Sequence, residues 1–328
     1  MARIVLGFGS SHGPTIATVP SEWDRMAERD KKDPRYNYAE LLSRADPRLV
    51  KEITTEKKAE RYEACQAAIR ELRGIVEDAK ADVVVVISNA HGVLPDDSMP
   101  VFGVFRGPVL TERDRGAPVE SDPRMASYRG PAAVVTSRPE RAARSYPAHP
   151  ELAAHLLDSL IDEGFDVASS LELRKEHGLD EAFQAYYELY DPACRTPMLP
   201  FFLSRYLPSQ ASPRRCYAMG AALRRAIESW DSEARVALMA SGGLSHQIID
   251  QELDEIVANA LINGDAGTLC SLSRERLNRA PGTPEILNWI AVAAAMDPNH
   301  MKLIDYVPCY RSPAGTGHGV TFGYWPAA

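Results

Sequence analysis

The chain has few cysteines, no long apolar run and a deficit of basic residues. Its 5 cysteines include no CxxC pair, which argues against a disulfide framework or a thiolate zinc site. This cysteine usage fits a reducing compartment, and Met1–Ile4 does not begin a signal-peptide core, so we expect a cytoplasmic protein. No apolar stretch approaches membrane-spanning length, so we expect no membrane partner. The chain has 37 Lys and Arg against 45 Asp and Glu, so its net charge is negative. Binding to phosphates needs a surplus of basic residues, so we also expect no nucleic-acid partner.

Several catalytic signatures are missing as well. The sequence contains no GxxxxGK[ST] phosphate loop, no HExxH zinc motif and no GxSxG nucleophile elbow. Ser245 lies next to His246, and adjacent side chains rarely reach the geometry of a catalytic triad. With 45% hydrophobic and 25% charged residues, the chain nevertheless has the composition of an ordinary globular protein.

Three histidines share one local pattern, in which an apolar run ends in a turn of small residues that carries the histidine. His12 follows the run 4–8, His91 follows the all-aliphatic run 83–87, and His246 follows the run 236–240. Continuous apolar runs are typical of buried parallel strands, and sites in α/β proteins gather beyond the carboxyl ends of such strands. We therefore expect His12 and His91 to share one metal ion.

The order of the expected elements predicts an α/β fold. Helical periodicity from Thr55 to about Lys80, with Thr55 as the expected cap, leads into the strand before His91 and forms a βαβ unit. We expect one domain over residues 1–328, with a central mixed sheet flanked by helices and the site at the strand ends. Two polar stretches, near 20–50 and 110–146, are expected to be loop insertions, and the last segment is expected to be a glycine-rich tail.

The other histidines carry weaker signals. His149 and His155 are six residues apart, a spacing that places them on different faces of a helix, so structural roles are expected, with His149 as a candidate cap. His177 lies on a charged turn, and His300 and His318 are expected to be surface or packing residues. Glu285 follows Pro284 at the start of an apolar helix, where a carboxylate can simply complement the helix dipole.

At these residues the chain resembles the class III extradiol ring-cleavage dioxygenases of the protocatechuate 4,5-dioxygenase type, specifically the catalytic β subunit, a family that includes gallate and 3-O-methylgallate dioxygenases. The matching segments keep the family's order from the amino terminus to the helix after Glu285. They are Ser10-Ser11-His12, Asn89-Ala90-His91, His149-Pro150-Glu151-Leu152, His177-Gly178, the stretch 215–220, the stretch 242–247 and Glu285.

The resemblance implies a reaction and a set of roles. It implies Fe(II)-dependent extradiol cleavage of a catecholic aromatic acid, such as protocatechuate, gallate or 3-O-methylgallate, with both atoms of O2 inserted. His12, His91 and Glu285 would be the Fe(II) ligands, with Glu252 as the fallback for Glu285. His246 would be the active-site base and His177 a second acid/base or positioning group. The family also implies a homodimer, with a separate small subunit as an alternative.

Other functions stay open at this point. The substrate could be a 2-aminophenol in place of a catechol. The same ligands could hold zinc in a hydrolase that activates water, since two histidines and a glutamate also form catalytic zinc sites. A non-catalytic metal-binding relative on the same scaffold is the remaining alternative.

Overall fold

A large sheet runs through the molecule. The computed structural model describes residues 1–327 apart from 90, 92–98, 113–142, 174–177 and 206. The sheet strands in the described part of the chain are β1 (Arg3–Ser10), β2 (Val83–Asn89), β3 (Phe102–Phe105), β6 (Val167–Ser170), β7 (Met198–Leu203), β8 (Arg235–Ser241), β9 (His246–Ile248), β10 (Lys302–Tyr310) and β11 (Thr316–Pro326). A separate hairpin pairs β4 (Val109–Glu112) with β5 (Arg144–Pro147).

The sheet is mixed, as expected. Its order is β10-β11-β1-β8-β2-β7-β3-β6, and β9 pairs with β11. The central strands β1, β8, β2 and β7 are parallel to their neighbours in this order, whereas β11 is antiparallel to β1 and β3 is antiparallel to β7. Because β1, β2 and β8 are parallel, their carboxyl ends meet at one edge of the sheet, where α/β proteins bind ligands.

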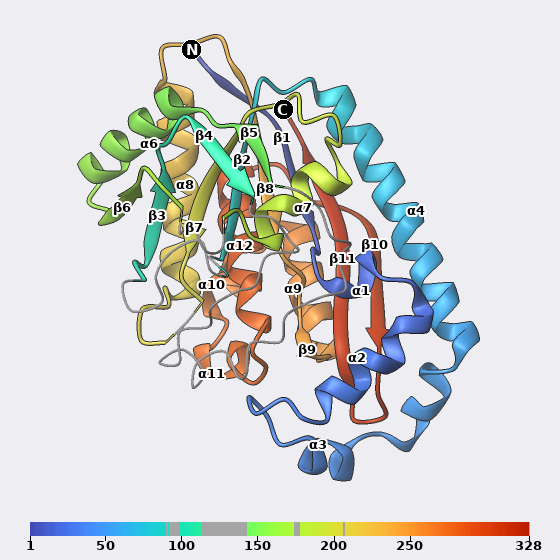
Figure 1. Cartoon of the computed structure of the whole chain (residues 1–328). Coiled ribbons are helices and arrows are strands. Elements are labelled where there is room, and N and C mark those ends of the chain that lie inside the picture. Colours follow the sequence, from blue (N-terminus) through green and yellow to red (C-terminus); the bar gives the residue numbers. More distant parts are fainter. Residues whose placement is uncertain (90, 92–98, 113–142, 174–177, 206, 328) are drawn as a thin grey trace.

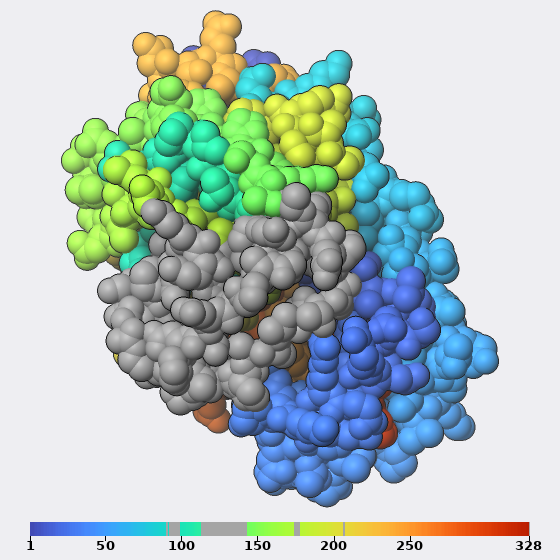
Figure 2. Space-filling model, in the orientation of Figure 1, coloured from blue at the N-terminus to red at the C-terminus, as the bar shows by residue number. Residues whose placement is uncertain are grey.

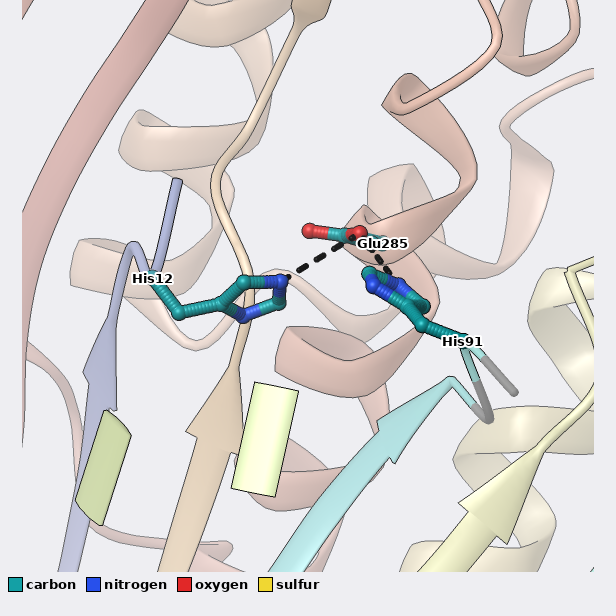
Figure 3. A group of neighbouring side chains, drawn as sticks. All are labelled: His12, His91 and Glu285. Carbon is teal, nitrogen blue, oxygen red and sulfur yellow. Dashed lines mark ion pairs between the residues drawn. The ribbon is translucent and has the colours of Figure 1, made fainter. Parts of the chain in front are cut away.

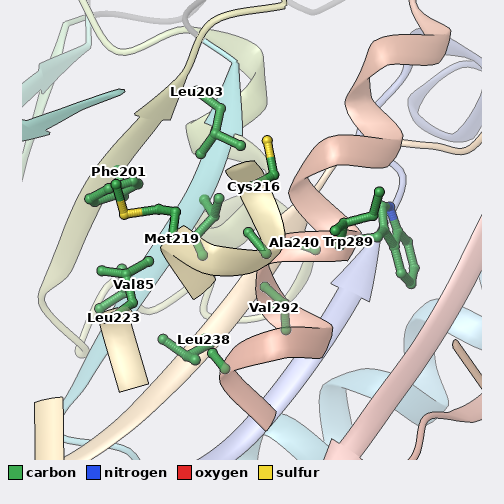
Figure 4. Packing of buried hydrophobic residues seen from close by; sticks show 14 of the residues in the cluster. Val85, Phe201, Leu203, Cys216, Met219, Leu223, Leu238, Ala240, Trp289 and Val292 are labelled. Atoms are coloured by element: carbon green, nitrogen blue, oxygen red, sulfur yellow. The ribbon is translucent and has the colours of Figure 1, made fainter. Parts of the chain in front are cut away.

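Strand β2 shows why this sequence forms a buried central strand. All of its residues are buried, and its side chains alternate between two hydrophobic cores. Val85 contributes to the core on one face, while Val84 and Val86 contribute to the core on the other. Figure 4 shows Val85 packed with Met219 and Leu223 in the first of these cores.

Helices cover both faces of the sheet. On one face lie α6 (Pro150–Asp162), α8 (Pro213–Ser229), α9 (Gln251–Asn263), α10 (Ala266–Ser271) and α12 (Ile286–Met296), with the short α11 (Arg274–Leu277) nearby. On the other face lie α4 (Thr55–Ala79), which runs along β10 and β11, and α7 (Glu181–Leu189). Helix α12 is buried along almost its whole length, which explains its strongly apolar sequence.

The first expected insertion, near 20–50, is a set of short helices. They are η1 (Pro20–Glu22), α2 (Trp23–Asp30), α3 (Tyr38–Arg44) and η2 (Pro47–Glu52), which follow α1 (Pro14–Ala17). The space-filling view shows this blue segment beside α4 on the surface (Figure 2). Most of the second expected insertion, near 110–146, lies outside the described residues; its described ends pair as β4 and β5.

Two local expectations are wrong. The cap of α4 is Thr54, whose side chain accepts a hydrogen bond from the backbone N–H of Lys57, because the helix begins with Thr55 itself. The expected glycine-rich tail is largely β11, which pairs with three other strands, β1, β9 and β10. Glycine is depleted in strands in general, so the composition of this segment concealed its structure.

Candidate metal centre and active site

Three side chains from distant parts of the sequence converge at the carboxyl edge of the central strands. His12 follows β1, His91 follows β2, and Glu285 ends the 3-10 turn η5 (Thr283–Glu285) before α12. Oε1 of Glu285 lies 3.1 Å from Nε2 of His91 and 3.8 Å from Nε2 of His12. One ligand atom from each residue lies within 4.8 Å of the others. Figure 3 shows the three side chains pointing toward one another.

The hydrogen bonds of His91 fix which ring nitrogen faces the cluster. Its Nδ1 lies 3.2 Å from Oε1 of Glu181, so Nδ1 carries the proton and donates to this carboxylate. Its backbone N–H donates to Oδ2 of Asp180 at 2.7 Å. The buried Nε2 faces the cluster, 3.1 Å from Oε1 of Glu285. Carboxylate partners of this kind orient metal-binding histidines.

His12 is oriented in the same sense by a different partner. Its Nδ1 lies 3.0 Å from Oγ of Ser241, and this hydroxyl donates its own proton to the carbonyl of Ala182. The hydroxyl therefore accepts from Nδ1–H of His12, which leaves the Nε2 lone pair directed at Glu285. Burial lowers the pKa of His12 to about 4, so the ring is neutral near pH 7, as a metal ligand must be.

Glu285 is buried at the centre of the cluster. Burial raises the pKa of this carboxyl, but the neighbouring rings of His246, His12 and His91 outweigh burial and hold the pKa well below its usual range. Gly242 makes room for the carboxylate: its φ is +141°, and a Cβ there would lie 2.6 Å from Oε2 of Glu285. The fold therefore places an ionised carboxylate within reach of the Nε2 atoms of two histidines.

These donors fit a divalent transition metal. Non-haem Fe(II) oxygenases bind their metal through two imidazole nitrogens and one carboxylate oxygen, which occupy one face of the ion and leave the other positions open. The fit rests on the chemistry and convergence of these donors, because one ligand atom from each of the three residues lies within 4.8 Å of the others. Among the predicted site residues, the structure thus brings His12, His91 and Glu285 together.

His246, the predicted base, lies beside Oε2 of Glu285, the carboxylate oxygen that does not face His91. Its Nε2 is 3.1 Å from Oε2 of Glu285, and its Nδ1 is 3.0 Å from the carbonyl oxygen of Leu244. Because a carbonyl only accepts, Nδ1 carries a proton and Nε2 is the position that can gain or lose one. Gly282 lets the ring lie against the backbone, since a Cβ there would meet Cδ2 of His246 at 2.0 Å.

The remaining predicted residues lie elsewhere. Glu252, the fallback ligand, has an exposed side chain on α9 and pairs with Arg276, so the structure places Glu285 and not Glu252 in the cluster. His149 accepts from the backbone N–H of Leu152 and caps α6, as expected for a capping group. His155 packs between helices, with Nε2 2.8 Å from the carbonyl of Ala226 on α8. His177 lies outside the described residues.

His318 is a packing residue, one of the two roles expected for it, and the residue it packs against is the predicted base. β9 and β11 pair so that His318 stands opposite His246, with ring centroids 5.4 Å apart. A pocket beside the cluster is lined by Ser11, Gly13, Thr15, Ile16, Gly243, His246, Glu285, His318 and Val320. The histidine was missed because the segment that carries it was not recognised as a strand.

Arg205 is a second residue that the sequence did not single out. It follows β7, and its Nη1 lies 3.3 Å from Oε1 of Glu285, so a guanidinium shares the oxygen that faces His91. Its positive charge works against protonation of His91. Burial also lowers the pKa of that ring, but Glu181 and Glu285 outweigh both effects and raise it to about 10, so a metal ion binding at Nε2 would have to displace a proton. No pattern in the sequence distinguishes this arginine from the others.

The fold and the cluster together define an α/β protein with a candidate two-histidine, one-carboxylate metal centre at its strand ends. Residues 46–321 match the family described as the catalytic LigB subunit of aromatic ring-opening dioxygenase, and the chain belongs to this family. This confirms the resemblance found in the sequence. The matched segment includes His91, His246 and Glu285, whereas His12 precedes it, so the place of His12 in the cluster rests on the structure.

Curated relatives carry related names. Gallate dioxygenase of Pseudomonas putida is 28% identical over 162 residues, which are 46% of each chain. A 2,3-dihydroxyphenylpropionate/2,3-dihydroxicinnamic acid 1,2-dioxygenase of Burkholderia vietnamiensis is 32% identical over 126 residues, 38% of each chain. Its namesake in Mycolicibacterium paratuberculosis is 28% identical over 180 residues, 55% of this chain and 48% of the relative. The alignments therefore span less than half of each relative.

Within the described part of the chain, no helix combines the length and the apolar character needed to cross a bilayer.

Proposed function

We propose that this chain is an Fe(II)-dependent extradiol dioxygenase that cleaves the ring of a catecholic aromatic acid. The observation that carries the proposal is the convergence of Nε2 of His12, Nε2 of His91 and Oε1 of Glu285 at a buried strand-end site. The family match and the names of the relatives support the same reaction class. We infer that residues 1–328 act as one catalytic unit, since the residues of the cluster come from both ends of the chain.

His12, His91 and Glu285 would hold the iron. Iron there would supply a Lewis-acidic site for the two catechol oxygens and for O2, and a path for electrons between them. The residues themselves position and shield this site: Glu181 and Ser241 fix the two imidazole orientations, and the strand ends bury the carboxylate.

His246 would act as the base that receives a phenolic proton at Nε2. Leu244 holds its Nδ1–H, so the ring can accept a proton only at the nitrogen that faces the cluster. The carboxylate of Glu285 would stabilise the resulting imidazolium at 3.1 Å. The role of His177 as a second acid/base group stays a prediction, as do the homodimer, a separate small subunit and the cytoplasmic location.

The test is oxygen uptake by protein that has been loaded anaerobically with Fe(II). Protocatechuate, gallate, 3-O-methylgallate, catechol, 2,3-dihydroxyphenylpropionate and 2-aminophenol form the substrate panel, and absorbance follows the ring-opened product. We expect stoichiometric oxygen uptake with at least one dihydroxy acid. Activity restricted to 2-aminophenol would change the substrate class. No uptake with any compound, in protein whose iron content has been measured, would contradict the proposal, and so would full activity with zinc.

A further inference from the structure

The pocket beside the cluster is lined by polar groups that the proposed chemistry does not use. His318 lies at its wall, and the structure decides which nitrogen of its ring is protonated. The hydroxyl of Thr15 and Nη1 of Arg311, the latter at 3.4 Å, both approach Nδ1 of His318. A guanidinium can only donate, so Nδ1 must be the acceptor and the neutral ring carries its proton on Nε2.

The ring of His318 is held neutral. Burial lowers its pKa well below the ordinary value, and the nearby charge of Arg311 lowers it further. The Nε2–H is therefore a fixed donor near pH 7. It lies close to Gly13, another residue of the pocket wall, and no described residue accepts its hydrogen bond.

A second donor lies in the same pocket. The oxygen of Ser11 accepts a hydrogen bond from the backbone N–H of Thr321 at 3.1 Å, which leaves the hydroxyl proton available to a further acceptor. The apolar side chains of Ile16 and Val320 also line the pocket, together with Ser11 and His318. Two donors with apolar surface beside them suit an aromatic ring that bears an oxygen substituent.

The pocket has a carboxylate in its lining, Glu285, and a buried guanidinium, Arg311, behind Thr15 and His318. Arg311 forms a buried ion pair with Asp30, at 2.9 Å from Nη2 to Oδ1, and its Nη1 is directed towards Thr15 and His318. The Asp30 carboxylate is held by Arg311 and Thr316. The guanidinium therefore lies next to Thr15 and His318, and its charge favours an anionic substituent beside these two residues.

We propose that Nε2–H of His318 and the hydroxyl of Ser11 form a subsite that binds the carboxylate of an aromatic acid while its ring lies at the Glu285 cluster. This inference rests on the proposed function for the position of the ring, and it adds a residue that selects the substrate. His318 stands opposite His246 in the β9–β11 ladder, so the subsite and the base are fixed by the same pair of strands.

The test is anaerobic calorimetry of 3,4-dihydroxybenzoate and of catechol, which differ by the carboxylate alone, on Fe(II)-loaded protein. His318→Phe keeps a ring against His246 but removes the donor. We expect it to weaken dihydroxybenzoate binding by ~10- to 100-fold, the loss of one charge-assisted hydrogen bond, and to leave catechol binding within ~2-fold. His318→Gln, whose amide N–H can reach the position of Nε2, should recover most of the difference, and Ser11→Ala should show a smaller selective loss.

The controls keep the two proposals separate. His300→Phe, at an exposed position, should change neither affinity, and melting by circular dichroism checks that each variant is folded. Equal weakening of both ligands in His318→Phe, or no weakening of either, would overturn the subsite. Because calorimetry does not depend on turnover, a selective loss in protein that shows no oxygen uptake would support the subsite while contradicting the proposed reaction. Oxygen uptake by the wild-type protein, without a selective loss of dihydroxybenzoate binding in His318→Phe, would support the proposed reaction and contradict the subsite.

Discussion

Nε2 of His246 lies 3.1 Å from Oε2 of Glu285, on the opposite side of the carboxylate from the oxygen that faces His91. The two oxygens of Glu285 therefore contact groups with different proposed functions. Its Oε1 belongs to the candidate metal centre, and its Oε2 belongs to the candidate base. A change at Glu285 would disturb both, whereas changes at single histidines should separate them.

Substitution His246→Ala should reduce turnover by orders of magnitude and leave the metal bound. The residue lies on the Oε2 side of Glu285, so its loss removes a proton acceptor without removing a ligand. General-base groups contribute roughly 10²- to 10⁴-fold to rate, and we expect a fall in kcat of this size. Iron content per chain and oxygen uptake measure the two effects. His155→Ala, which alters a helix-packing histidine, is the matched control. Loss of iron in His246→Ala would assign this residue to the metal centre instead.

Substitution His12→Ala should remove both iron and activity. The Nε2 of His12 is one of only three ligand atoms in the cluster of described residues, and the hydroxyl of Ser241 would lose its donor. Metal titration under anaerobic conditions should show at least ~10-fold weaker binding, as loss of even an outer-shell partner has effects of this size. A variant that binds iron as wild type does would show that the ligand set is wrong.

Substitution Gly242→Ala tests the space around Glu285. The added Cβ would lie 2.6 Å from Oε2, and φ at this position is +141°, so both the carboxylate and the backbone must shift. We expect weaker iron binding together with lower stability. Gly164→Ala is the matched control: its φ is +81°, but a Cβ there meets nothing within 4 Å. The control should lose about 1–2 kcal/mol of stability from backbone strain and keep its metal affinity. Equal metal affinity in the two variants would show that Gly242 is not needed for the site.

Asp254 should make stability depend on pH. Burial raises its pKa to about 6, although hydrogen bonds from Ser245 and Tyr306 oppose the rise. A folded-state pKa above the ordinary 3.8 means that the folded protein holds this proton more tightly than the unfolded chain. The stabilisation is therefore fully present below pH ~3.8 and is lost as the pH rises through about 6.

The isosteric variant Asp254→Asn does not titrate and removes this dependence. Between pH 4 and 7, its free energy of unfolding relative to wild type should rise by about 2–3 kcal/mol. Urea unfolding at four or five pH values measures the difference. Asp158→Asn, at an exposed position on α6, should follow the wild-type profile. A constant difference between Asp254→Asn and wild type would contradict the prediction.

The sequence predicts the centre of the fold better than its edges. The apolar runs of β1, β2 and β8 are visible because a strand buried on both faces needs a continuous apolar sequence, and this placed His12 and His91 at strand ends. β11 was missed because its glycines lie where other chain segments pack closely: a Cβ at Gly319 would lie 2.2 Å from Oδ2 of Asp254. Close approach of this kind depends on the tertiary fold and leaves no local pattern.

Some residues of the site can likewise be predicted from the local sequence, and others cannot. The pattern of small residues after a strand identified His246, but local sequence could not choose Glu285 over other carboxylates, and only the family resemblance did so. Arg205 and His318 reach the site through side-chain directions and strand pairing that no spacing rule contains. Local sequence patterns therefore do not identify residues that reach the site only because strands distant in the sequence pair there.

The order of the ligands along the chain has a consequence for how the centre is assembled. His12 follows β1, whereas Glu285 directly precedes α12. A nascent chain that has not yet released η5 from the ribosome can offer at most two of the three candidate ligands. Metal capture is therefore expected to follow synthesis of the segment from β1 to η5. Because the ion would then bind the native state and not the unfolded chain, the free energy of unfolding should increase with the concentration of available iron.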